Sequence, residues 1–119
     1  MAQDRPTASE LLAAIADFLR EEALPALDRA EPRLGFQMRV AVNSLAILER
    51  ESRLGPAADA RERERLTKLL GRDGSVHELN RELARQLRTG QRDERDAALM
   101  AHLDATIADK IAIANPKWR

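Results

Sequence analysis

Apolar residues recur every three or four positions along most of this chain, which is the spacing of one face of an α-helix. The first such segment follows the stretch TASE at Thr7–Glu10. TASE is a capping box, in which the Thr7 hydroxyl accepts from the Glu10 amide and the Glu10 side chain reaches back. No segment has the alternation of apolar and polar residues that a half-buried strand needs. The sequence therefore predicts an all-α fold.

Turn signals divide the chain into five expected helices. Pro25 is expected to end or kink the first, because proline lacks an amide hydrogen and clashes with the preceding turn. Gly55-Pro56 is expected to stop the second, since glycine at a helix end followed by proline is a strong stop. A second capping box, Ser75–Glu78, opens the fourth. The predicted helices cover residues 8–24, 32–54, 57–70, 76–88 and 94–114, with a tail at 115–119.

The length of 119 residues suits one domain, so residues 1–119 are predicted to form a single helical domain. Only three residues are aromatic, namely Phe18, Phe36 and Trp118. The core must then consist of aliphatic side chains and methionine, which suits packing of helix on helix. We expect a bundle of four to five helices in which neighbours in sequence pack antiparallel. The first two helices are expected to dominate its core.

Composition argues against several classes of function. Twenty basic and twenty acidic residues cancel, so the chain lacks the basic footprint of a nucleic-acid-binding protein. There is no cysteine, which removes disulfides and thiolate chemistry and suits a reducing compartment. No apolar run reaches the roughly eighteen residues of a membrane span, and the N-terminus does not resemble a signal peptide. We expect a soluble, cytoplasmic protein that binds neither nucleic acid nor membranes.

Residues for catalysis or metal binding do not cluster in the sequence. The only histidines are His77 and His102, and neither has the spacing of a zinc motif. Ser44 and Ser75 have no histidine and aspartate at a recognisable spacing. There is no glycine-rich phosphate loop. We therefore expect no metal, no cofactor and no catalytic site, and a function other than catalysis is favoured.

The stretch QMRVAVNSLAILER, residues 37–50, belongs to the most informative helix. One broad apolar face consists of Leu34, Met38, Ala41, Leu45 and Leu48. A second, on nearly the opposite side, consists of Phe36, Val40 and Ile47. A helix that is apolar on two sides is usually packed on both. Between the faces runs a polar strip of Arg39, Asn43 and Arg50, with Arg53 at its margin.

Two interpretations of this strip remain open. In the first, which is favoured, the strip faces solvent, or Arg39 extends its charged end to water while Asn43 bonds a neighbouring backbone. In the second, Arg39 and Asn43 line a crevice and bind a small anionic metabolite, with Arg50 in support. Arginine offers a planar fork of donors for a carboxylate or phosphate, and asparagine adds a donor and an acceptor.

Two other features also have two interpretations. The RERER run at residues 61–65 is expected to be a solvated, salt-bridged helix surface. Trp118 follows the helix-stopping Pro116 near the chain end. It either folds back onto the core, which is favoured, or anchors a partner, as aromatic residues often do at interfaces.

Several segments together resemble a family of small, all-helical bacterial proteins of unknown function. They are RPTASELLAAIADFLREEALPAL, RVAVNSLAILERE, LLGRDGS with LN and LRTG, and KIAIANPKW, which together extend over nearly the whole chain. The resemblance implies genes encoded beside acyl-CoA dehydrogenases and aminoglycoside-phosphotransferase-like kinases. It implies a role in acyl-CoA or small-molecule phosphotransfer metabolism, and it carries no catalytic residues over.

The leading hypothesis is a non-enzymatic helical accessory protein that binds a neighbouring kinase or dehydrogenase, or a second copy of itself. Small helical proteins often cover spare apolar surface by self-association. The alternative hypothesis is a binding module for a small anionic metabolite, such as an acyl-CoA or a phosphorylated compound, on the polar strip.

Overall fold

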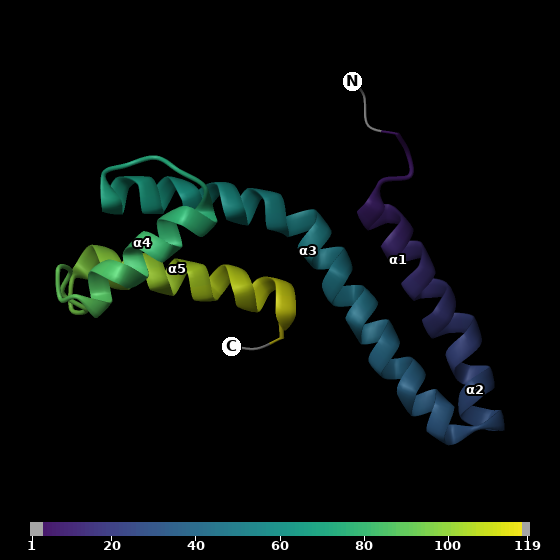
Figure 1. Ribbon diagram of the computed structural model, residues 1–119. Coiled ribbons are helices and arrows are strands. Elements are labelled where there is room, and N and C mark those ends of the chain that lie inside the picture. The colour runs from purple at the N-terminus through teal and green to yellow at the C-terminus, as the bar shows by residue number, and fades with distance from the viewer. Residues whose placement is uncertain (1–3, 118–119) are drawn as a thin grey trace. The chain divides into compact units, whose positions relative to one another are not determined.

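The computed structural model describes residues 4–117 (Figure 1). The described residues contain helices and no strand, so the predicted all-α class is confirmed. The chain divides into two compact units, Met1–Leu54 and Gly55–Arg119. The single domain expected over residues 1–119 stays a prediction.

The first unit begins with a helical segment in three parts, α1 (Ala8–Phe18), η1 (Leu19–Ala23) and α2 (Leu24–Ala30). The capping box at its start is confirmed. The Glu10 amide donates to Thr7 Oγ1 over 3.2 Å, and the Thr7 amide donates to Glu10 Oε1 over 2.8 Å. Two of the amides that a helix start leaves unpaired are thus satisfied within four residues.

Helical backbone continues past Pro25, so the predicted end of the first helix at residue 24 is wrong. The segment η1 is a π-helix, and the Leu24 amide donates to the Leu19 carbonyl, five residues back. Pro25 then lies in the first turn of α2. An amide at such a position needs no partner within its own helix, so the missing hydrogen of proline costs little there.

The next helix, α3 (Pro32–Leu70), contains Pro56 in its interior. The predicted stop at Gly55-Pro56, and the division into helices 32–54 and 57–70, are therefore wrong. A proline removes one backbone hydrogen bond, while the alanine, arginine and glutamate residues after it are strong helix formers. Gly55-Pro56 coincides instead with the boundary between the two compact units.

The second unit contains the end of α3, α4 (Val76–Arg88) and α5 (Ala97–Ala114). Its core is a leucine cluster to which all three helices contribute. The members are Leu66, Leu79, Leu83 and Leu99, with Leu69, Leu70, Val76 and Leu87 packed against them. The largest fully buried side chains of the described chain all lie here. The expectation that residues 8–24 and 32–54 dominate the core is therefore wrong.

The ends of α4 and α5 follow local side-chain chemistry. The Ser75 capping box is confirmed, with the Glu78 amide donating to Ser75 Oγ over 3.1 Å. The last helix starts at Ala97 rather than at residue 94, because Asp96 is its N-cap and accepts from the Ala98 amide over 3.0 Å. Gly90 has φ +76°, a conformation that favours glycine, and it helps turn the chain out of α4.

Candidate interaction surface

The first unit is a helical hairpin, in which α1, η1 and α2 lie beside the first part of α3 (Figure 1). We call these elements, up to Leu54, the N-terminal hairpin. Its closed end depends on Gly35. A Cβ atom there would overlap the Asp28 carboxylate and lie 3.1 Å from the Asp28 Cα. The hairpin also has an ion pair between Asp28 and Arg39. Glycine therefore allows α2 and α3 to approach closely.

Each arm of the hairpin presents large apolar side chains to solvent. On α1 they are Leu11, Ile15 and Phe18, which helical turns of about 100° per residue stack on one side. On α3 they are Leu34 and Leu48, which lie two heptads apart. The exposed fractions of these five side chains lie between 47% and 60%. The buried apolar residues of the hairpin are small by comparison, namely Ala16 and Val42.

The exposed rows lie on the same side of the hairpin. The buried Ala16 and Val42 mark the sides on which the two arms contact each other. Viewed along each helix from its N- to its C-terminus, each row is rotated from its marker in the same sense, by about 100–160° on α1 and about 80–120° on α3. Because the arms run in opposite directions (Figure 1), this rotation brings both rows to one side. We call this set the apolar face, and it consists of Leu11, Ile15, Phe18, Leu34 and Leu48.

Charge is scarce around the apolar face. Residues 8–19 and 34–48 contain three charged side chains, Glu10, Asp17 and Arg39, although 34% of the whole chain is charged. Helical turns place all three away from the face. Depletion of charge distinguishes the centre of protein interfaces from ordinary surface. The apolar face therefore has the composition of an interface.

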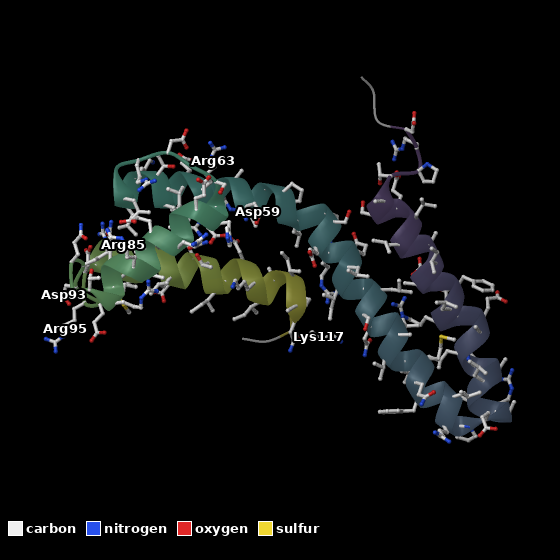
Figure 2. The ribbon with its side chains drawn as sticks, in the orientation of Figure 1. Asp59, Arg63, Arg85, Asp93, Arg95 and Lys117 are labelled. Carbon is white, nitrogen blue, oxygen red and sulfur yellow. The ribbon has the colours of Figure 1, made fainter. Side chains whose placement is uncertain are left out.

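The second unit has a different surface. Figure 2 shows Asp59, Arg63, Arg85, Asp93 and Arg95 projecting from its helices and turns. Two of these groups, Arg63 and Arg85, are in ion pairs, and Arg63 pairs with Asp73 at 3.0 Å. Arg85 is hydrogen-bonded to Glu82 in the same helix. The second unit also exposes large apolar side chains, Met100, Leu103 and Ile107, but all three belong to one helix, α5. The hairpin differs in that exposed apolar rows of two helices lie on one side.

The polar strip predicted to bind an anion lies on the N-terminal hairpin. Arg39 and Asn43 are exposed, and Arg50 is half-buried. The Arg39 side chain is 52% exposed, and its guanidinium is paired with Asp28. An anion would have to compete with that carboxylate, which counts against Arg39 as a first contact. Ligand binding by Arg39, Asn43 and Arg50 stays a prediction.

Other expectations for this region have mixed outcomes. Phe36 and Val40 belong to the second apolar side of the helix and are exposed, at 65% and 51%, so packing on both sides is not seen for them. Trp118, the predicted partner anchor, lies outside the described residues. Sequence periodicity identified the leucines of the apolar face but assigned them to the core. What distinguishes an exposed apolar face from a core here is that the hairpin has few large buried residues for these leucines to pack against; its buried apolar residues are Ala16 and Val42.

The described part of the chain holds no group of three or more histidine, cysteine, aspartate or glutamate side chains that could bind a metal ion. Within residues 4–117, no helix has both the length and the apolar character needed to cross a membrane.

A family described as a domain of unknown function (DUF6285) matches residues 25–118. The chain belongs to this family. The matched residues include α3, α4, α5 and all of α2 but its first residue, while α1 and η1 lie before them. The resemblance to an uncharacterised family is thereby confirmed. The chain matches no curated protein and no solved structure.

Proposed function

We propose that this DUF6285 protein is a non-enzymatic helical interaction protein, and that its apolar face docks against the same face of a second copy. The observation that carries the proposal is the apolar face itself, with five large side chains about half exposed and no charge among them. The two arms of the hairpin pack against each other, and neither arm covers the apolar face. Two such pairs, face to face, make a four-helix bundle.

The spacing of the residues supports helix packing at this face. Leu34, Met38, Ala41, Leu45 and Leu48 follow one another at intervals of four, three, four and three residues. This is the heptad spacing of helices that interlock side chains along a seam. Met38 and Leu45 are half-buried within the hairpin, while Leu34 and Leu48 remain open. The seam is therefore only partly filled by the chain's own α1.

The size of the face is consistent with a dimer. Large apolar residues bury on the order of 200 Å² each, so five that are half exposed offer roughly 500 Å² per copy. A standard interface buries about 800 Å² per partner, including its polar rim. Small and uncharged neighbours, Gln37, Ala41 and Ser44, adjoin the face and can supply part of that rim.

A phosphotransferase-like kinase or an acyl-CoA dehydrogenase, the partners implied by the resemblance, is the alternative occupant. The scarcity of charge favours a second copy, because the face offers few groups with which to recognise a polar surface on another protein. Pull-down of the chain from its host with those two enzymes distinguishes the cases. A complex of one enzyme with monomeric protein would replace self-association.

The test measures the mass of the full chain by sedimentation at several concentrations. The wild type is expected to be dimeric at micromolar concentration. Ile15→Glu and Leu48→Glu, which place a charge in the apolar face, should be monomeric because a buried unpaired carboxylate is costly. Phe36→Glu is the control, since Phe36 is also a large exposed apolar residue, at 65%, but lies away from the face. A monomeric wild type, or equal loss of dimer in all three variants, would overturn the proposal.

A further inference from the structure

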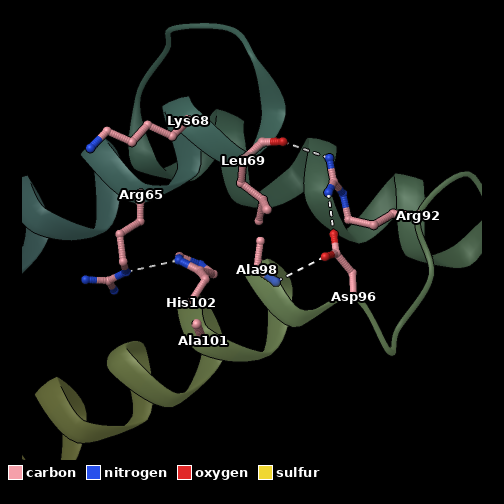
Figure 3. Close-up of a pocket in the computed structure, with 8 residues that line it drawn as sticks. All are labelled: Arg65, Lys68, Leu69, Arg92, Asp96, Ala98, Ala101 and His102. Atoms are coloured by element: carbon pink, nitrogen blue, oxygen red, sulfur yellow. Dashed lines mark hydrogen bonds and ion pairs between the residues drawn. The ribbon is translucent and has the colours of Figure 1, made fainter.

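The second unit contains a cavity of about 510 Å³ between the end of α3 and the start of α5 (Figure 3). Ligand pockets commonly have volumes of roughly 300–1,000 Å³. Leu69, Ala98 and Ala101 provide apolar wall, while Arg65, Lys68 and His102 bring nitrogen donors to it. All of these residues belong to one compact unit. The cavity is thus independent of the apolar face on the N-terminal hairpin.

One wall of the cavity is fixed by Arg92. Its guanidinium donates to the Leu69 carbonyl over 2.8 Å, to Gln86 Oε1 over 3.1 Å and to Asp96 Oδ2 over 3.2 Å. Asp96 also caps α5 through the Ala98 amide. The only carboxylate that lines the cavity among the described residues is therefore already paired and hydrogen-bonded. It presents no uncompensated negative charge to a ligand.

His102 supplies a directed donor. Its side chain is nearly buried, with 4% of the residue exposed, and its Nδ1 accepts from Arg65 Nε over 3.1 Å. Burial, followed by the charge of Arg65, lowers the pKa of His102 below its usual value, which keeps the ring neutral. A neutral ring that accepts at Nδ1 carries its hydrogen on Nε2. The hydrogen bond of the ring to Arg65 is made at Nδ1, and no buried side-chain nitrogen of the described residues lacks a partner, so an Nε2–H without one is reached by solvent from the cavity.

The remaining cations are available to a ligand. Arg65 is held by His102 and by Thr106 Oγ1, at 3.1 Å, so its guanidinium is oriented in advance. Lys68 has a 3.5 Å contact with Glu64, and both side chains are largely exposed. Such a surface pair is worth little and can exchange for a ligand oxygen. The cavity is lined by Arg65, Lys68 and Arg92 and by one carboxylate, Asp96, so its lining has a net positive charge. The net charge of the whole chain is zero.

We infer that this cavity binds a small organic anion with an apolar body. Its carboxylate or phosphate accepts from Lys68, Arg65 and the His102 Nε2–H, while its carbon skeleton lies against Leu69, Ala98 and Ala101. This site is not predicted from the sequence, because Arg65 belongs to the RERER run, whose charge pattern predicts a solvated helix surface. Arg61 and Arg63 do pair at the surface, with Asp109 and Asp73.

The experiment titrates the full chain with hexyl phosphate by calorimetry and by amide NMR. Saturable binding is expected, with the largest shifts in the first turns of α5. Hexanol and hexylammonium are matched probes without the negative charge, and they should not saturate. Absence of saturable binding at millimolar hexyl phosphate, or equal binding of hexanol, would overturn the inference and leave the Arg92 and Arg65 contacts as internal braces of the fold.

Two variants locate the site. Lys68→Gln should weaken hexyl phosphate binding about threefold to tenfold, as expected for loss of one hydrogen bond at an exposed position. Ala101→Glu, at an exposed position, should abolish binding by placing a carboxylate at the wall. Lys110→Gln, which removes an exposed cation elsewhere on α5, is the control and should bind as the wild type does. Equal weakening in Lys110→Gln would also overturn the inference. Ile15→Glu should retain binding, so that failure of the dimer is distinguishable from failure of the pocket.

Discussion

At the scale of single residues, His102 should make stability depend on pH. Burial and the Arg65 charge lower its pKa in the folded state, while Glu62 opposes this with a smaller effect. The unfolded state then binds the proton first as pH falls below the ordinary value of 6.5. We expect the melting temperature to decrease between pH 7 and pH 5, as the contribution of neutral His102 is lost.

The variant His102→Gln checks this prediction, because glutamine can still accept from Arg65 but does not titrate. Its melting temperature should be lower than that of the wild type at pH 7, and the gap should narrow toward pH 5. His77→Gln, at an exposed position, is the control and should follow the wild-type curve. If the difference in melting temperature between the wild type and His102→Gln stays constant from pH 7 to pH 5, His102 is not the source of the pH dependence.

Glu82 gives a second residue-scale prediction, with the same sign but at lower pH. Hydrogen bonds from Arg85 and then from Gln86 lower the pKa of Glu82 to about 2. A carboxylate with a depressed pKa stabilises the fold above its unfolded value of about 4.5 and loses that effect as pH falls toward 2. Glu82→Gln should therefore melt below the wild type at pH 7.

Differential scanning calorimetry at pH 7, 4 and 2.5 measures this effect. The difference between Glu82→Gln and the wild type should shrink steadily below about pH 4.5. Glu94→Gln is a suitable control, since Glu94 is exposed and lies in the turn before α5. An equal difference at all three pH values would show that packing of the side chain, rather than its charge, is responsible.

At the scale of elements, Gly35 tests how α2 and α3 meet. Gly35→Ala adds a Cβ that displaces Asp28 from Arg39 and crowds the Asp28 backbone. Crowding costs about 1–3 kcal/mol, and alanine regains about 1 kcal/mol of helix propensity. A net loss of about 1 kcal/mol in the free energy of unfolding is expected by urea denaturation. Gly74→Ala, where the new Cβ would lie 3.5 Å from Leu79, should change stability much less.

Elements also show what sequence patterns can and cannot predict. The capping boxes at Thr7 and Ser75 were correct to the residue, because each is a closed set of bonds within four positions. The stop predicted at Pro56 is wrong, and of the two outcomes expected at Pro25, an end or a kink, the end is wrong. A proline removes one amide, and its effect depends on the turns around it, which here are a π turn at Pro25 and strong helix formers at Pro56.

The candidate sites divide in the same way. The heptad spacing makes the row from Leu34 to Leu48 recognisable in the sequence, but periodicity does not say whether another chain covers that row. The cavity of the second unit was not predictable, because Arg65 and His102 lie 37 positions apart and meet only through packing of α3 against α5. Contacts between residues close in the sequence, such as the capping boxes, can therefore be predicted from it, while contacts between distant residues, such as Arg65 and His102, cannot.

At the scale of the whole molecule, self-association should couple stability to protein concentration. If the apolar face of the N-terminal hairpin binds a second copy, association stabilises the folded state. The melting temperature must then rise with protein concentration. The second unit has its own leucine core of Leu66, Leu79, Leu83 and Leu99 and lies outside the proposed interface. Concentration should therefore stabilise the hairpin and leave the second unit nearly unchanged.

Amide hydrogen exchange at 5 μM and 500 μM separates the two units in one experiment. Amides of α1 and the first part of α3 should become better protected at the higher concentration, while those of α4 should not. Ile15→Glu should abolish the dependence, and Phe36→Glu should retain it. Protection that is independent of concentration throughout α1 would mean that the apolar face has no second copy against it, and the proposed function would fail at that point while the anion site of the second unit would stand untouched.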